Sequence, residues 1–404
     1  MNTTHILLFD IDGVLVEDRG YRAGVIATLT HYSHLMGLVN AAPDPASLDV
    51  FHAHGYTNEW DICPLAIGSF IVETLRRAPE IKLQTTPLDS FFAQFGSQLS
   101  PAGPIDFAHY VEQTDRYLGR PSERALAVLL EALSQIDLSE TARRAAEAAL
   151  REMLKDPYNF AQSPVTQFFQ EQVLGSIAFE TAYRRPPRFN LPSLLLSEDR
   201  SLLNATARHT LDQLAASNQA YTCVYTARPS LPPIDAEAAG QSIGYSPEAE
   251  LAAQLDQLDQ YPLIAMGRMQ WLAAQVQQPY EALTKPAPVQ ALAAIGAALS
   301  RREADSLRAA YAFYVDGELN APLDELVGQS AEVWVVEDAT LGLRAAKGAV
   351  DLLKACGLEA KFHGLGISNG GPKAEALAPL CEAILPDINA AIEYIDHRVK
   401  DAAK

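Results

Sequence analysis

The sequence predicts an α/β fold in which a doubly wound parallel sheet carries an inserted all-helical domain. Its 404 residues are too many for one ordinary domain and suit two, since domains commonly hold about 100 to 200 residues. Short apolar runs alternate with Ala- and Leu-rich stretches long enough for helices, which is the pattern of βαβ crossovers. One long stretch, residues 21–192, instead shows helical periodicity and no convincing strand pair.

The short apolar runs are the predicted strands. The first, residues 6–9, is continuous and ends at Asp10, as expected of a strand buried on both faces of a parallel sheet. Similar runs occur at residues 221–225, 263–266, 311–315, 333–336 and around 384–385. The first run is therefore expected at the centre of the sheet.

Residues 21–192 are the predicted helical domain. Leucines between residues 126 and 133 recur at the spacing of one helix face, and the following run is Ala-rich. The chain enters this domain after Gly20 and leaves it through residues 184–192, whose prolines favour an extended connection. The remaining residues, 1–20 and 193–404, form the predicted α/β domain. The stretches 79–104 and 229–247 are expected to be long surface loops.

The composition excludes several classes of protein. Hydrophobic residues make up 48% and charged residues 20%, which is typical of a globular chain and not of a disordered one. The formal charge of −19 would repel nucleic acid and anionic membranes. The N-terminal segment has no basic region, and aspartates interrupt its apolar run, so we expect neither a signal peptide nor a membrane span there.

The four cysteines are expected to be reduced, buried thiols. Cys63, Cys223, Cys356 and Cys381 lie far apart, and no CxxC pair or zinc-type spacing occurs. This pattern favours a cytoplasmic protein.

Two aspartates directly follow the first predicted strand. Asp10 and Asp12 are two residues apart on an extended backbone, so both carboxylates can face one site. Open α/β sheets bind ligands beyond the carboxyl ends of their strands. Two carboxylates kept close together need a cation, and magnesium prefers such oxygen ligands. By itself, however, Asp-Ile-Asp-Gly fits a turn equally well.

Four further residues strengthen the prediction of a phosphate and metal site. Thr226 ends a predicted strand and offers a hydroxyl to a phosphate oxygen. Lys285, before Pro286, supplies a compact positive charge. Glu337 and Asp338 add carboxylates at another strand end. Taken separately, these residues are most often a strand residue, a solvated loop and a helix N-terminus.

Together, the segments 9–15, 225–229, 285–288 and 335–339 resemble the four ordered motifs of the haloacid dehalogenase-like hydrolase superfamily. The resemblance implies a Rossmann-like core with a helical cap inserted between the first two motifs. It also implies magnesium-dependent hydrolysis of a phosphate monoester through an aspartyl phosphate. With an aspartate two residues after the expected nucleophile, the sequence resembles the phosphatases and phosphomutases of the family. This resemblance disfavours dehalogenation.

The resemblance also implies a role for each motif residue. Asp10 is expected to be the nucleophile and Asp12 the general acid and base, while Thr226 and Lys285 bind phosphate. The acids expected at the magnesium site are Asp10, Asp12, Glu337 and Asp338.

One alternative concerns the last of these motifs. The predicted strand at 311–315 is followed by Asp316, with Asp324 further on, and either acid could complete the metal site. We prefer Glu337 and Asp338, because the sequence after them resembles the helix that follows this motif in capped members. Residues 311–330 are then an inserted strand and turn of unassigned role.

The substrate contacts are expected in part from the helical domain. Arg22 follows the first domain crossing, and Asn58 lies in an Asn-x-Trp-Asp segment similar to one in a subgroup of capped hydrolases. Asn58 can equally be a helix N-cap, and Trp60 can be a core residue. Arg228, two residues after Thr226, is a third candidate for binding the substrate.

The expected ligand is a small phosphorylated metabolite bound by a monomer or homodimer, without nucleic acid or membrane. A phosphomutase of the same fold and a non-catalytic phospholigand-binding or scaffolding protein are the alternatives.

Overall fold

The computed structural model describes residues 3–38, 48–56, 58–96, 105–236 and 245–402. The chain forms two compact units, one of residues Met1–Asp18 with Asp199–Lys404 and the other of residues Arg19–Glu198. The sequence suggested crossings near residues 20 and 193. The second crossing lies later because the Ser193 hydroxyl donates to the Val173 carbonyl at 2.9 Å, and the helix at residues 194–198 packs against the helices at residues 20–35 and 164–174 of the second unit.

The first unit contains a six-stranded sheet whose neighbouring strands all run parallel. Its strands are β1 (Thr3–Phe9), β4 (Ala220–Tyr225), β5 (Leu263–Ile264), β6 (Ser330–Glu337), β7 (Glu359–Ile367) and β8 (Ala383–Leu385). The spatial order is β5-β4-β1-β6-β7-β8, so the chain winds outward from β1 in both directions. The predicted doubly wound parallel sheet is confirmed. A separate pair, β2 (Val16–Glu17) and β3 (Arg200–Ser201), is antiparallel.

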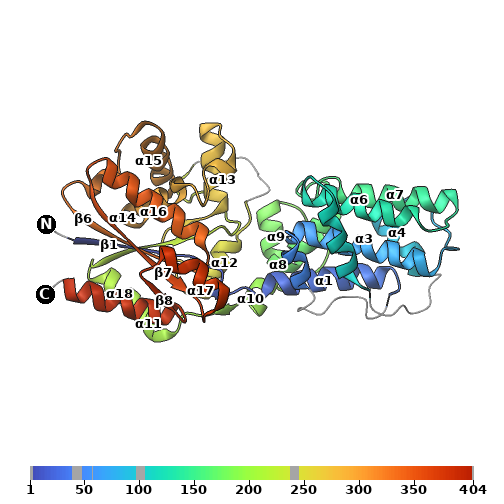
Figure 1. Ribbon diagram of the computed structural model, residues 1–404, viewed down its shortest axis with the longest axis horizontal. Coiled ribbons are helices and arrows are strands. Elements are labelled where there is room, and N and C mark those ends of the chain that lie inside the picture. The colour runs from blue at the N-terminus through green and yellow to red at the C-terminus, as the bar shows by residue number, and fades with distance from the viewer. Residues whose placement is uncertain (1–2, 39–47, 57, 97–104, 237–244, 403–404) are drawn as a thin grey trace. The chain divides into compact units, whose positions relative to one another are not determined.

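Strand β1 is central because both of its faces are apolar. Ile6 and Leu8 contribute to one core cluster and Leu7 and Phe9 to the other, and all four side chains are fully buried. The other strands and the helices that cover the two faces of the sheet (Figure 1) supply the rest of both clusters. With Ile6 and Leu8 are residues of α13 (Met266–Val276), α14 (Pro288–Ser300), α15 (Glu303–Asp316) and α16 (Thr340–Ala355). With Leu7 and Phe9 are residues of α11 (Ala205–Ala216), α12 (Glu248–Leu255) and α18 (Ile388–Ala402).

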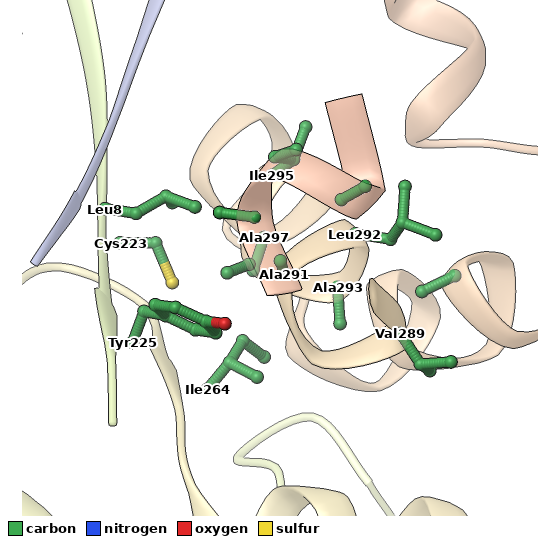
Figure 2. Close-up of a cluster of buried hydrophobic side chains, with 14 of the residues drawn as sticks. Leu8, Cys223, Tyr225, Ile264, Val289, Ala291, Leu292, Ala293, Ile295 and Ala297 are labelled. Atoms are coloured by element: carbon green, nitrogen blue, oxygen red, sulfur yellow. The ribbon is translucent and has the colours of Figure 1, made fainter. Parts of the chain in front are cut away.

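Helix α14 packs against strands β1, β4 and β5. Figure 2 shows Leu8, Cys223 and Tyr225 facing the buried side chains of this helix. Many of the α14 side chains are alanines, whose small size lets the helix pack against the sheet and against α15 and α16 at once. The helix is therefore fixed on several sides. Shorter helical elements of this unit are α17 (Gly371–Leu377) and the 3₁₀ turns Tyr280–Ala282, Leu323–Leu326 and Ala378–Leu380.

The strand predicted at residues 311–315 is wrong, since these residues form the end of helix α15. Residues such as Tyr311 and Phe313 favour strands locally, but Leu307, Ala310 and Phe313 are buried at helical spacing in the core cluster that contains α14. Tertiary packing thus overrides local propensity. Strand β7 lies outside the predicted strands, because glycines interrupt its apolar run.

The described part of the second unit is helical, in agreement with the periodicity of its sequence. Its helices are α1 (Gly20–Leu35), α2 (Asp49–Ala53), α3 (Glu59–Arg77), α4 (Leu88–Gly96), α5 (Phe107–Gln113), α6 (Pro121–Ser134), α7 (Glu140–Leu154), α8 (Pro164–Leu174), α9 (Ser176–Tyr183) and α10 (Leu194–Glu198), with a 3₁₀ turn at Thr114–Arg116. Helix α4 lies within the stretch 79–104, so the prediction of one long loop there is wrong. Its phenylalanines pack in the interior, where Phe92 contacts Tyr32 of α1 edge to face.

All four cysteines are free thiols. Cys63 and Cys223 are buried as predicted, whereas Cys356 is exposed and Cys381 is partly exposed, which corrects the expectation for these two. No described helix has the length and apolar character required to cross a bilayer.

The burial of side chains on β6 can be tested by mutating two valines, one buried on this strand and one exposed outside it. We expect Val333→Ala, in the fully buried core cluster, to lower the free energy of unfolding by about 2 kcal/mol, since it removes two methyl groups and leaves a cavity. Val327→Ala, at a position 61% exposed, should change it by less than about 0.5 kcal/mol. Equilibrium urea unfolding measures both, and equal effects would contradict the described burial.

Candidate active site

The site is built where the carboxyl ends of β1, β4 and β6 meet. Phe9, the last residue of β1, is paired with Val224 on β4 and with Val336 on β6. Asp10 continues this register, because its backbone N–H donates to the Val336 carbonyl at 3.1 Å. Parallel pairing thus brings together segments that are far apart in the sequence.

Three carboxylates converge at this edge of the sheet. One oxygen from each of Asp10, Glu337 and Asp338 lies within 4.8 Å of the others. Glu337 is 1% exposed, and its burial, together with the charge of Asp10, raises its pKa well above the ordinary value, although Lys285 opposes the shift. A magnesium ion fits this set of hard oxygen donors.

Lys285 brings a positive charge to two of these carboxylates. Its Nζ lies 2.6 Å from Glu337 Oε1 and 3.3 Å from Asp10 Oδ1, and it donates to the Tyr225 carbonyl at 3.0 Å. The same atom lies 3.9 Å from the centroid of the Tyr225 ring. Burial alone would lower the pKa of Lys285, but the charges of Asp10 and Glu337 outweigh it and raise the pKa above the ordinary value. The predicted meeting of Lys285 and Asp10 is thus present.

Gln290 of α14 joins the segments that carry Lys285 and Thr226. Its Oε1 accepts a hydrogen bond from the Lys285 backbone N–H at 3.3 Å, while its Nε2 donates to the Thr226 carbonyl at 2.8 Å. Sequence reasoning missed this residue, because a glutamine in an Ala-rich helix carries no local signal. Thr226 itself is 1% exposed, and its hydroxyl oxygen accepts from the Arg228 backbone N–H at 3.3 Å.

Two glycines leave room for the carboxylates. A Cβ on Gly342, in the first turns of α16, would lie 1.6 Å from Glu337 Oε1. A Cβ on Gly13 would lie 2.3 Å from Asp338 Oδ2, and Gly13 also has a positive φ of 70°. Any other residue at these two positions would displace a carboxylate, so the glycines are part of the site.

The sequence predicts Asp12 at the metal site, but the Asp12 carboxylate pairs with Arg228. Its Oδ1 lies 2.7 Å from Nε and 2.6 Å from Nη2 of Arg228, and it is not a member of the carboxylate group described above. The Arg228 guanidinium also donates to Asp199 Oδ2 through Nη1 and Nη2, each at 3.1 Å. The side chains of Arg228 and Asp199 are both 1% exposed. Arg228 therefore holds Asp12, and a contact of Arg228 with the substrate stays a prediction.

The two other expected substrate contacts lie in the helical unit. Arg22 Nη2 pairs with Asp49 Oδ1 at 2.7 Å. Asn58 is the N-cap of α3, where its side chain accepts from the Trp60 backbone N–H at 2.8 Å. Asn58 therefore has the structural role that was the alternative to substrate binding, that of a helix N-cap. A contact of Arg22 or Asn58 with substrate stays a prediction.

The alternative metal-site acids lie elsewhere. Asp316 is the last residue of helix α15, and Asp324 belongs to a 3₁₀ turn. Among the described residues, the group of acids close enough to share one ion contains Asp10, Glu337 and Asp338 and neither of these two.

Lys373 is a charged residue of the site that sequence reasoning missed. Its Nζ lies 2.6 Å from Asp338 Oδ2. It belongs to α17, which follows β7, the neighbour of β6 in the sheet. Recognition of β7 as a strand would have placed its following loop beside Asp338.

Comparison with known proteins gives structural similarity only. No protein-family model and no curated protein matches the sequence. An X-ray structure determined as Northeast Structural Genomics Consortium target ZR25 matches 99% of this chain and 100% of its own, with a TM-score of 0.65 and 15% identity. That protein shares the fold. Phosphatase Tt82 from Thermococcus thioreducens matches 97% of this chain and 99% of its own, with a TM-score of 0.41 and 13% identity. A hydrolase from Pseudomonas syringae matches 98% of this chain and 99% of its own, with a TM-score of 0.32 and 14% identity.

The close approach of α16 to Glu337 predicts opposite outcomes for two glycines of one helix. Gly342→Ala should lower the free energy of unfolding by about 1 to 3 kcal/mol, because the added methyl group overlaps the Glu337 carboxylate. Gly348→Ala meets only ordinary contact, 3.6 Å from Pro288 Cβ, and should be neutral or stabilising by up to about 1 kcal/mol. Urea unfolding of both variants checks the difference. Equal stability would contradict the described position of Glu337.

Removal of Arg228 should be costly for a different reason. Arg228→Ala leaves the buried Asp199 carboxylate without its cation, and we expect a loss of about 3 to 5 kcal/mol in the free energy of unfolding. The control is Arg308→Ala, whose side chain is 57% exposed and pairs with Asp305, and it should lose less than about 1 kcal/mol. If thermal and urea unfolding rank the two arginines the other way, Arg228 is not a structural ion-pair partner.

Proposed function

We propose that this chain is a haloacid dehalogenase-like hydrolase, and that it is a magnesium-dependent phosphatase acting on the phosphate monoester of a small metabolite. The single observation that carries the proposal is the convergence of Asp10, Lys285, Glu337 and Asp338 at one edge of the sheet. These residues come from three of the four segments that carry the family resemblance. The fourth segment contributes Thr226 at the end of the adjacent strand β4.

Asp10 is the proposed nucleophile. One of its carboxylate oxygens attacks phosphorus, so an O–P bond to Asp10 forms while the bond from phosphorus to the leaving oxygen breaks. Lys285 lies within 3.3 Å of Asp10 Oδ1, where its charge can stabilise the phosphoryl oxygens during transfer. Thr226 is the proposed hydroxyl contact for one of these oxygens.

Asp12 is the proposed carrier of the proton. It protonates the leaving alkoxide in the first step and takes a proton from the attacking water in the second, which releases inorganic phosphate and restores Asp10. Arg228 fixes the Asp12 carboxylate through two short contacts and is itself fixed by Asp199. We propose that this ion-pair chain sets the position from which Asp12 acts.

The acids proposed to hold the metal are Asp10, Glu337 and Asp338. Bound magnesium would offset their charge and that of the phosphoryl group. The formal charge of −19 supports a small metabolite as substrate in preference to nucleic acid or an anionic membrane surface.

A phosphatase assay with an aryl phosphate tests this function. We expect phosphate release with magnesium, loss of release with EDTA and recovery when magnesium is restored. Asp10→Asn should lower the rate by more than about 10³-fold, because it removes the nucleophile. The control, Asp351→Asn, removes an exposed acid of α16 that pairs with Lys347 and should leave the rate unchanged.

Two other outcomes identify the alternatives. A wild-type protein no faster than Asp10→Asn would contradict catalysis and favour a phospholigand-binding role. Conversion of a sugar phosphate to an isomer, without release of phosphate, would favour a phosphomutase that uses the same Asp10 chemistry.

A further inference from the structure

Two lysines contact the carboxylate group, and they differ in how firmly they are held. Lys285 bonds Asp10 and Glu337 and is 9% exposed, while Lys373 bonds Asp338 and is 46% exposed. Three carboxylates and two ammonium groups leave a formal charge of −1. The site thus already holds two positive charges before any divalent cation enters.

Lys285 is confined on several sides. Its Nζ has two carboxylate partners, one backbone carbonyl and the Tyr225 ring within contact distance. Its position is further fixed by the hydrogen bond from its backbone to Gln290. Withdrawal of this side chain would leave a buried Glu337 without its cation, which is costly.

Lys373 lies in more open surroundings. It stands two residues after Gly371, and a Cβ added to Gly370 or Gly371 would meet no atom within 4 Å. Among the described residues, its ammonium group bonds to Asp338 Oδ2, and its side chain is a flexible four-carbon chain. Lys373 can therefore leave Asp338 at small cost, whereas Lys285 cannot leave its partners.

We infer that Lys373 competes with the divalent cation for Asp338, and that it thereby sets the metal affinity of the site. A cation bound to the Asp338 carboxylate takes up part of its negative charge and repels an ammonium group at 2.6 Å from the same carboxylate. Metal binding therefore includes the release of Lys373 from Asp338. This inference rests on the proposed function, because it requires that Asp338 holds a metal.

Binding of Mn²⁺ to the full chain measures this competition without an activity assay. We expect Lys373→Met to lower the Kd for Mn²⁺ by about threefold to fivefold, the factor that corresponds to the free energy of an exposed ion pair. Electron paramagnetic resonance of free Mn²⁺ gives the Kd, and displacement by Mg²⁺ gives the value for that ion.

The matched control is Lys347→Met. Lys347 is 50% exposed, pairs with Asp351 Oδ2 at 2.7 Å and lies on α16 of the same unit. This variant removes the same net charge from a surface ion pair outside the site, and it should leave the Kd unchanged. A similar gain in affinity for both variants would mean that net charge alone is responsible, and it would overturn the inference.

A double-mutant cycle with Asp338→Asn separates competition at Asp338 from repulsion through space. In the Asp338→Asn background, Lys373→Met should no longer tighten Mn²⁺ binding, because the carboxylate under competition is gone. A gain of the same size in both backgrounds would overturn the inference.

The same measurements separate this inference from the proposed function. If the wild type binds no Mn²⁺ and Asp338→Asn changes nothing, the metal-dependent function fails and the inference fails with it. If the wild type binds Mn²⁺ and Asp338→Asn weakens binding, but Lys373→Met does not tighten it, the inference fails alone.

Discussion

The mutual repulsion of three carboxylates at the end of β1 and β6 is the constraint on which the rest of the site depends. Asp10, Glu337 and Asp338 are held within a few ångströms by backbone pairing, so they cannot relax apart. Nearby lysines reduce this repulsion with their positive charge. Lys285 does so from inside the core, where the low dielectric makes its contacts with Asp10 and Glu337 strong.

The core helices hold that arrangement in place. Gln290 on α14 connects the segments of Lys285 and Thr226, and α16 approaches Glu337 so closely that only glycine fits at position 342. Both helices belong to one apolar cluster with β1, β4 and β6. Packing and charge are thus linked: the core sets the carboxylate positions, and those positions create the need for cations.

Much of the fold could be predicted from the sequence, because its central strands are continuous apolar runs that end in acids. Asp10, Thr226 and Glu337 could be placed for the same reason, since each stands at a strand end and parallel strands share one edge. The strand predicted at residues 311–315 is wrong because packing against α14 outweighs the local preference of these residues for strands. This failure is one of context, not of periodicity.

The rest of the site depends on long-range contacts that leave no local pattern. Arg228 looks like an open anion contact in the sequence, and only the return of the chain at Asp199 shows that it is buried in an ion pair. The place of Lys373 at the site could not be predicted, because β7 contains glycines and its sequence is not a continuous apolar run. Side-chain partners far apart in the chain were therefore the least predictable part of the site.

The antiparallel pairing of β2 with β3 has a consequence for the history of the chain. Glu17, just before the helical unit begins, is paired with Arg200, just after it ends, as in the two arms of a β-hairpin. The whole helical unit therefore occupies the place of a hairpin turn. Gain or exchange of such a unit alters a loop and leaves the register of the main sheet intact, so the same α/β sheet can carry different inserted domains.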